Sequence, residues 1–247
     1  ETNIITVEDP IEMNIEGINQ VQVNSEIGMT FAAALRSILR QDPNVILIGE
    51  IRDSETAQIA VRASITGHLV LSTIHTNNSL ATIERLLDMD VERYLLSTAL
   101  EGIISQKLAR RICPVCRTIR PTTPYERKVF KDALGLNVNE MWVPNKCEHC
   151  INGFLGRIAI QEVLLINEDI RDIISKDDTD KETLREFVYG KNHTITLLQD
   201  GLDKVVKGYT TFEEIYKLVE IEDDADSKVA EMSIEEEKEE SEEKTID

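Results

Sequence analysis

Polar residues that could act on a phosphate group follow three short apolar runs early in the chain. These residues are Glu8 after residues 3–7, Glu50 after residues 45–49, and Thr73 and His75 after residues 68–72. In phosphoryl transfer, a carboxylate holds Mg²⁺ directly or through water, and another polar group orients the attacking water. The residue types therefore indicate a nucleotide-phosphate site, provided that the three runs are neighbouring strands.

Each of these residues also has an ordinary structural interpretation. Glu50 could interact favourably with the dipole of a following helix, and Glu8 could be a turn residue before Pro10. His75 could be a hydrogen-bonded structural histidine. An apolar run that ends in a carboxylate is a weak motif by itself, so the chemical interpretation depends on the residues acting together.

The four cysteines form a second group with a defined chemistry. They occur as two Cys-x-x-Cys pairs, Cys113 with Cys116 and Cys147 with Cys150, separated by 30 residues. Two such pairs can place four thiolates around one tetrahedral ion, and Zn²⁺ suits this closed set of soft ligands. Free buried thiols and disulfides are the alternatives, and His149 is a possible substitute ligand. Because four protein ligands leave no open coordination position, the spacing predicts a structural zinc site.

The three apolar runs have the composition of buried strands, with helices predicted between them. These helices run from Thr30 to before Pro43, and from Asp53 or Ser54 to Gly67. The run 45–49 is apolar on both faces, which is typical of a parallel strand whose sheet has helices on both sides. The alternation predicts an α/β fold with a parallel sheet, and ligands of such sheets bind beyond the carboxyl ends of the strands.

The rest of the chain is predicted to be mainly helical. Helices are expected over residues 80–89, 92–112, 168–175, 181–189, 197–207 and 211–220, and the run 158–166 is a strand or the start of a helix. Lys107, Arg110 and Arg111 would then interact with the carboxyl terminus of the helix 92–112 or contact a neighbouring subunit. Thr211 and Glu214 have the spacing of a capping box.

Four parts of the chain are predicted from these elements. Residues 1–112 form the α/β core, 113–156 a small four-cysteine module, 157–221 a helical subdomain, and 222–247 an acidic disordered tail. The tail carries about half of the formal net charge of -19.

Charge and hydropathy exclude several classes of function. A net charge of -19 would repel phosphate backbones, so nucleic acid is not an expected partner. No run approaches the roughly 20 apolar residues of a membrane span, and the first residues have no secretory pattern. These features predict a cytoplasmic protein, in which persistent disulfides are disfavoured.

Three segments together resemble the motor ATPases of type II secretion and type IV pilus assembly, within the secretion ATPase superfamily. They are Thr-Val-Glu-Asp-Pro-Ile-Glu at 6–12, Leu-Arg-Gln-Asp-Pro-Asn-Val-Ile-Leu-Ile-Gly-Glu-Ile-Arg-Asp at 39–53, and Thr-Gly-His-Leu-Val-Leu-Ser-Thr-Ile-His-Thr-Asn at 66–77. These match the Asp box, the atypical Walker B motif and the His box of the family. The likeness extends through about Val219 and leaves out only the acidic tail.

The resemblance implies a RecA-like P-loop NTPase core that uses ATP and Mg²⁺. It further implies a homo-hexamer that drives polymerisation of pilin-like subunits, bound peripherally at the inner face of the cytoplasmic membrane through secretion or pilus assembly platform proteins. The implied roles are water polarisation by Glu8, Mg²⁺ assistance by Glu50, γ-phosphate contact by His75, a supporting role for His68, nucleotide-site lining by Thr73, and alternative Asp-box roles for Asp9 and Glu12.

The sequence departs from the family pattern at the phosphate-binding loop. The family carries a Gly-rich Walker A loop and an arginine-bearing arm before the Asp box, but no Gly-x-x-x-x-Gly-Lys-Ser/Thr sequence occurs in this chain. The chain also begins inside the predicted strand 3–7, which indicates a piece of a longer or split protein. Without the backbone cradle and the lysine, the chain alone is predicted neither to bind ATP tightly nor to hydrolyse it.

The cysteines separate the branches of this family. Its assembly ATPases typically carry a four-cysteine module, whereas its pilus retraction ATPases lack one, so the resemblance favours secretion or assembly. A retraction motor is one alternative. A non-enzymatic, zinc-bearing interaction module is the other, but it leaves the three strand-end motifs without a function.

Overall fold

The computed structural model describes residues 2–219, which form two compact units. The first unit contains the chain up to Ser105 together with Val163–Thr194. The second contains Gln106–Glu162 and the described residues from Ile195 onward. The predicted acidic tail at 222–247 lies outside the described residues.

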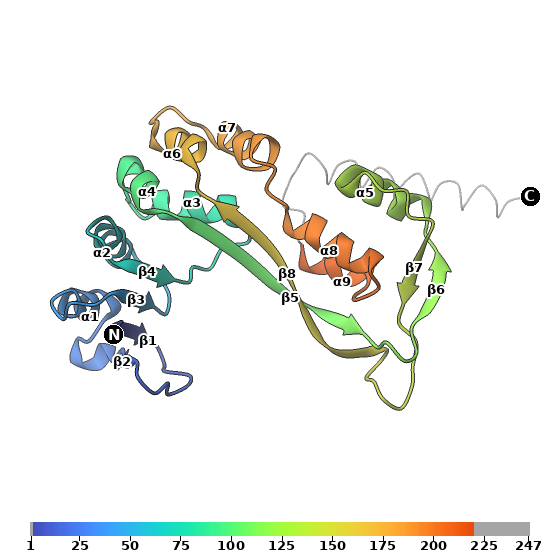
Figure 1. The fold of residues 1–247 in the computed structure, drawn as a ribbon, viewed down its shortest axis with the longest axis horizontal. Helices are drawn as coiled ribbons and strands as arrows, with labels where there is room; N and C mark the ends of the chain where they lie inside the picture. Colours follow the sequence, from blue (N-terminus) through green and yellow to red (C-terminus); the bar gives the residue numbers. More distant parts are fainter. Residues whose placement is uncertain (1, 220–247) are drawn as a thin grey trace, which may run out of the picture. The chain divides into compact units, whose positions relative to one another are not determined.

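The first unit contains a four-stranded parallel sheet (Figure 1). Its strands are β1 Ile4–Glu8, β2 Asn19–Gln22, β3 Val45–Ile48 and β4 Leu69–Ser72, in the order β2-β1-β3-β4. The predicted parallel α/β sheet is therefore confirmed. Strand β2 was not predicted, because it is short, polar and paired only with β1.

Two helices, α1 Phe31–Ile38 and α2 Ser54–Ile65, begin at the predicted caps. The side chain of Thr30 accepts a hydrogen bond from the Ala33 amide at 3.2 Å, and that of Asp53 accepts one from the Thr56 amide at 2.8 Å. These bonds satisfy amides that have no partner within the helix.

The two faces of the sheet are buried unequally. Helices α1 and α2 pack against each other and against β1 and β4, and Val70 packs against the same core. Leu69 and Leu71 point to the other side of β4 and are 54% and 47% exposed. Within residues 2–219, the sheet thus lacks the equal cover on both faces that the apolar run of β3 predicted.

The helices that follow β4 in the first unit mostly agree with the sequence prediction. They are α3 Ser79–Asp88, α4 Arg93–Ala99, α6 Glu168–Ser175, α7 Lys181–Arg185 and a π-helix at Glu186–Lys191. Arg171 joins α6 to the end of α4 through hydrogen bonds to the Ser97 and Thr98 carbonyls, at 2.6 and 3.1 Å.

The predicted helix over 92–112 is wrong. Helix α4 ends at Ala99, and Gly102–Ile112 forms strand β5, which pairs with β8 Phe154–Leu165. Buried Ile103 is followed by exposed Ile104, which is the alternation of a strand. Pairing with a strand some fifty residues away overrides the local helical spacing.

The basic residues on β5 consequently do not interact with the end of a helix over 92–112, which was one of the two predictions for them. The Lys107 ammonium donates to the Leu218 carbonyl at 2.6 Å, so it caps a different helix, near the end of the described chain. Arg110 forms an ion pair with Glu214, and the Arg111 guanidinium lies 5.8 Å from the centre of the Tyr209 ring.

The second unit is built around an antiparallel pair and three helices. These are β6 Thr118–Pro121, β7 Glu140–Val143, α5 Pro124–Leu134, α8 Leu197–Val206 and α9 Phe212–Leu218. Phe130, Ile160, Leu202 and Ile215 form its buried core. Helix α5 lies between the two cysteine pairs and accounts for their wide spacing.

Capping differs between two helices of the second unit. At α5, Thr123 and Glu126 form a reciprocal capping box. At α9, Thr211 accepts from the Glu214 amide at 3.1 Å, but the Glu214 carboxylate binds Arg110 instead of completing the predicted box.

The helices predicted between 157 and 221 are divided between the units. α6 and α7 belong to the first, and α8 and α9 to the second.

No helix within residues 2–219 has the length and apolar character needed to cross a bilayer.

Candidate functional site

The strand register brings the ends of β1, β3 and β4 to one level. Val7 lies opposite Ile48, and Ile48 lies opposite Ser72, so the residues that follow them meet at the carboxyl edge of the sheet. The Gly49 amide donates to the Val7 carbonyl at 2.7 Å, and the Thr73 hydroxyl donates to the Gly49 carbonyl at 2.6 Å. These bonds hold the three chain segments together where polar residues were predicted to converge.

Glu50 and His75 are in direct contact at this edge. The His75 Nε2 atom lies 3.0 Å from Glu50 Oε2, and the Arg52 guanidinium donates to Glu50 Oε1. The Glu50 side chain is only 12% exposed, whereas the His75 side chain is 85% exposed. The site therefore presents a mostly covered carboxylate beside an accessible imidazole.

Arg52 stabilises the ionised form of Glu50. Its hydrogen bond holds the pKa of Glu50 below the ordinary value, against the opposing effect of burial. The Glu50 carboxylate in turn raises the pKa of Arg52, with a smaller contribution from Asp9. Glu50 is thus ionised at neutral pH, as a carboxylate must be to assist a cation.

Glu8 occupies a separate position at the end of β1. Its Oε1 atom accepts from the Thr6 hydroxyl at 2.5 Å and from the Gln20 amide nitrogen at 2.9 Å. Gln20 belongs to β2, so the strand that was not predicted from sequence orients this carboxylate. The half-buried Glu8 is held by two neutral donors, whereas Glu50 is held by the charged Arg52 together with His75.

Other predicted site residues lie elsewhere. His68 precedes β4 at the amino-terminal edge of the sheet, and its Nδ1 atom lies 3.0 Å from the Ala63 carbonyl oxygen. The structure does not bring it to the edge that carries His75. Asp9 and Glu12 are exposed in the segment after β1.

Sequence reasoning missed two residues that position the acidic groups. Arg52 stands two residues after Glu50, so proximity was a usable signal for it. Gln20 gave no such signal, because its contact with Glu8 depends on the pairing of β1 and β2.

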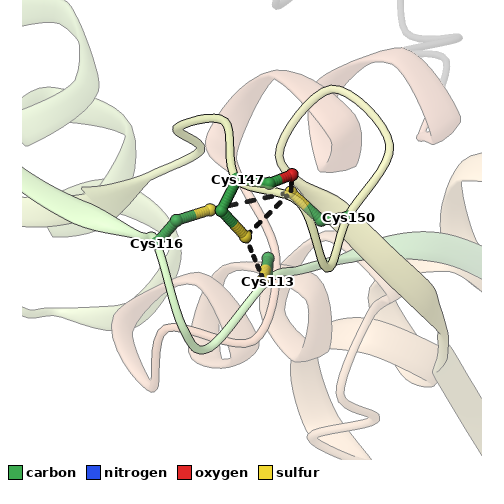
Figure 2. A group of neighbouring side chains, drawn as sticks. All are labelled: Cys113, Cys116, Cys147 and Cys150. Atoms are coloured by element: carbon green, nitrogen blue, oxygen red, sulfur yellow. Dashed lines mark hydrogen bonds between the residues drawn. The ribbon is translucent and has the colours of Figure 1, made fainter.

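The four cysteines converge in the second unit, as predicted (Figure 2). Their sulfur atoms all lie within 4.8 Å of one another. Three separations are 3.8 Å for Cys113 and Cys147, 3.7 Å for Cys116 and Cys150, and 3.6 Å for Cys147 and Cys150.

These separations fit a tetrahedral metal centre. Zinc–sulfur bonds of about 2.3 Å in a tetrahedron place the sulfur atoms about 3.75 Å apart. A disulfide requires about 2.05 Å, and all four thiols are free. The donor set is therefore that of a closed structural site for a soft cation.

Two loops supply these ligands. Cys113 directly follows β5 and Cys116 precedes β6, whereas Cys147 and Cys150 lie between β7 and β8. The Cys113 amide donates to the Gly153 carbonyl at 2.9 Å, which joins the loops. His149 is exposed and lies outside the sulfur cluster.

The thiols differ in acidity. A hydrogen bond with the Cys147 backbone is the main cause that lowers the pKa of Cys150 to about 7, whereas burial raises the pKa of Cys116 to about 12. A bound cation would favour the thiolate at all four positions.

A parallel α/β sheet with acidic groups and a histidine at its carboxyl edge, and a four-cysteine cluster in a second unit, define a P-loop ATPase-like protein with a cysteine-bearing second unit. The chain belongs to the type II/IV secretion system protein family, whose model matches residues 1–217.

Particular relatives agree with this assignment. The chain is 49% identical over 223 residues to type II secretion system protein E of Pectobacterium carotovorum subsp. carotovorum, covering 90% of this chain and 44% of that protein. It is 44% identical over 222 residues to the type IV pilus assembly ATPase PilB of Acinetobacter baylyi, covering 87% of this chain and 38% of that protein. The predicted resemblance to secretion and pilus ATPases is thereby confirmed.

A solved structure gives the same fold. The crystal structure of the pilus retraction motor PilT with bound ADP matches with a TM-score of 0.62 and 30% identity, covering 91% of this chain and 54% of that one. The chain spans less than half the length of the two curated relatives.

Proposed function

We propose that this chain is the hydrolytic and metal-bearing part of a motor ATPase that powers a type II secretion pseudopilus or type IV pilus assembly. The contact between Glu50 and His75 at the carboxyl edge, level with Glu8, is the observation that carries the proposal. Open α/β sheets bind their ligands at this edge.

Each acidic group has a separate role in the proposed reaction. Glu8 polarises the attacking water, because its carboxylate accepts hydrogen bonds from two neutral donors, the Thr6 hydroxyl and the Gln20 side-chain amide, and lies at the end of β1. Glu50 assists Mg²⁺, and its ionised state suits that role. His75 contacts the γ-phosphate through its exposed ring, and Thr73 lines the nucleotide site. Asp9 and Glu12 are alternative participants from the same segment.

The phosphate-binding loop is proposed to come from outside this chain. Parallel sheets normally bury both faces, but β4 lies at a sheet edge with Leu69 and Leu71 exposed. The other edge strand, β2, is partly covered by the segment that precedes it. The Gln20 side chain donates to the Met13 carbonyl at 3.1 Å and accepts from the Ile15 amide at 2.8 Å. A strand that pairs with β4 in parallel would deliver a phosphate-binding loop to the edge that holds Glu50 and His75.

The cysteine cluster favours an assembly or secretion motor over a retraction motor. Its four ligands fit structural Zn²⁺, with no position left for substrate. In the longer protein we propose a homo-hexamer that engages inner-membrane platform proteins and lies on the cytoplasmic side of that membrane. Nucleic acid is not a proposed partner, because the chain carries a net charge of -19.

Comparison of this chain with a longer protein that includes the phosphate-binding loop tests the proposal. The isolated chain should neither bind ATP at micromolar concentrations nor turn it over, whereas the longer protein should hydrolyse Mg²⁺-ATP. In the longer protein, Glu8→Gln should reduce kcat by about 10²–10⁴-fold. Glu16→Gln is the matched control, because Glu16 is exposed in the segment between β1 and β2.

Two results would overturn this assignment. Steady ATP turnover by the isolated chain would show that no phosphate-binding loop from outside the chain is needed. Wild-type kcat in the Glu8→Gln variant would remove Glu8 from the reaction.

A further inference from the structure

The turn between α8 and α9 contacts the segment that carries the first cysteine pair. The Ile112 amide donates to the Tyr209 carbonyl at 2.9 Å, and the Arg117 guanidinium donates to the Gly208 carbonyl at 2.6 Å. The buried Thr210 hydroxyl donates to the Arg110 carbonyl at 2.8 Å. Three successive turn residues therefore bind both sides of the Cys113–Cys116 loop.

An aromatic contact closes the same region. The Arg117 guanidinium stacks 4.2 Å from the centre of the Trp142 ring. Gly208 has a φ of +72°, and a Cβ atom there would lie 2.4 Å from Trp142 Cδ1 and 2.7 Å from Arg117 Nη1. Only glycine fits this turn while Trp142 and Arg117 remain in place.

The middle of the loop between these contacts has little packing of its own, although Cys113 is buried. Pro114 and Val115 are exposed, and Val115 is 66% exposed. Cys113 and Cys116 supply two of the four sulfur ligands, so a bound cation would fix the spacing between Ile112 and Arg117. Loss of the cation would remove that restraint and leave the loop held by the backbone hydrogen bonds of Arg117 with Cys113 and of Cys113 with Gly153.

We propose that metal binding at the four cysteines controls docking of the α8–α9 turn, so that the turn is held firmly only while the cation is bound. The site would thereby stabilise a C-terminal helical hairpin far from the cysteines in sequence, in addition to its own loops. This inference rests on the proposed zinc site.

Thermodynamic linkage allows the proposal to be tested by substitutions in the turn that change the zinc Kd. If the cation stabilises docking, docking must stabilise the bound cation by the same factor. Thr210→Val removes the hydroxyl bond to Arg110 without altering a ligand or the residues beside it. The bond contributes about 1 kcal/mol, so zinc Kd should rise roughly fivefold.

Thr122→Val is the matched control. Thr122 is also buried in the second unit, and its hydroxyl donates to the Val138 carbonyl at 2.7 Å. It follows β6 at the end remote from the cysteines, since Thr118 pairs with Val143 and Pro121 with Glu140. This variant should lose similar stability but change zinc Kd by less than about twofold.

A second pair of variants uses glycine. Gly208→Ala should weaken zinc binding at least fivefold, by the usual range of coupling. Gly135→Ala carries the same positive-φ strain, with a φ of +68°, but a Cβ there meets nothing within 4 Å. Its zinc Kd should stay within about twofold of the wild-type value.

Zinc affinity is measured on the full 247-residue chain by competition with a chromophoric chelator, and Trp142, the only tryptophan, reports docking by its emission. Chelation should red-shift the emission, and added Zn²⁺ should reverse the shift. Unchanged zinc Kd in both Thr210→Val and Gly208→Ala would overturn the coupling. Absence of zinc from the wild-type chain would instead refute the zinc site itself.

Discussion

Replacement of Gly49 by alanine tests whether the close approach of β1 and β3 sets the positions of the acidic groups. The Gly49 amide donates to the Val7 carbonyl at 2.7 Å. A Cβ atom at Gly49 would lie 3.2 Å from that carbonyl oxygen and 3.4 Å from the Glu8 Cα atom. Gly49 is not among the glycines with positive φ, so alanine would act through steric contact.

The magnitude follows from the rigidity of the neighbours. Both close atoms belong to the backbone, so β1 must shift by a few tenths of an ångström. Overpacking of this kind costs about 1–3 kcal/mol, and the reduced entropy of the unfolded chain offsets about 0.4–1 kcal/mol. Gly49→Ala should therefore lower the free energy of unfolding by about 1 kcal/mol.

The same shift should affect catalysis in a longer, active protein. A misplacement of 1 Å lowers turnover by about 100-fold, so a shift of about 0.3 Å predicts roughly a fourfold lower kcat. Nucleotide affinity should change little, because the phosphate-binding loop is proposed to lie outside this chain. The variant thus distinguishes an effect on the position of Glu8, measured by kcat, from an effect on nucleotide binding.

Urea denaturation of the chain, followed by circular dichroism, measures the stability change, and steady-state kinetics on the longer protein measure kcat. Gly190→Ala is the control, because a Cβ at Gly190 meets its nearest atom at 3.7 Å, an ordinary contact. A Gly49→Ala variant with wild-type stability and kcat would refute the reasoning.

Two further predictions concern the second unit. Metal analysis of the gently purified chain should find one zinc per chain, and less than about half would contradict a tight four-thiolate site. Arg120→Met should lower the free energy of unfolding by about 2–3 kcal/mol at neutral pH, because Glu126 would remain buried without its charged partner. Burial raises the pKa of Glu126, but hydrogen bonds from Arg120 and Thr123 outweigh it and keep that pKa low. Arg120 therefore stabilises the fold above a pH of about 4.3, and this stabilisation is lost as the pH falls through the lowered pKa of Glu126. If the Arg120→Met variant were still less stable than the wild type by the same amount in strong acid, this explanation would be wrong.

Local signals in the sequence predicted local structure well. Thr30 and Asp53 cap the helices that follow them, because their side chains reach amides three residues along the chain. The apolar runs before Glu50 and Thr73 are strands of a parallel sheet. The short spacing within each cysteine pair places two sulfur atoms on one loop, and the two pairs converge as predicted.

Long-range pairing accounts for the main failures. The segment Gly102–Ile112 has apolar residues at helical spacing, but pairing with Phe154–Leu165 makes it a strand. The pairing also removes the helix end at which Lys107 and Arg110 were predicted to lie, and it gives both residues partners in α9. No local pattern announces a partner so distant in sequence.

The sequence by itself determined the chemistry available to this protein: acidic groups and a histidine after strands, and four thiols in two pairs. Only the tertiary structure decided that Glu50 meets His75 and Arg52, that Gln20 holds Glu8, and that His68 faces the other edge. The reason is that side-chain contacts across a sheet depend on strand order and register, which arise from backbone pairing over the whole fold.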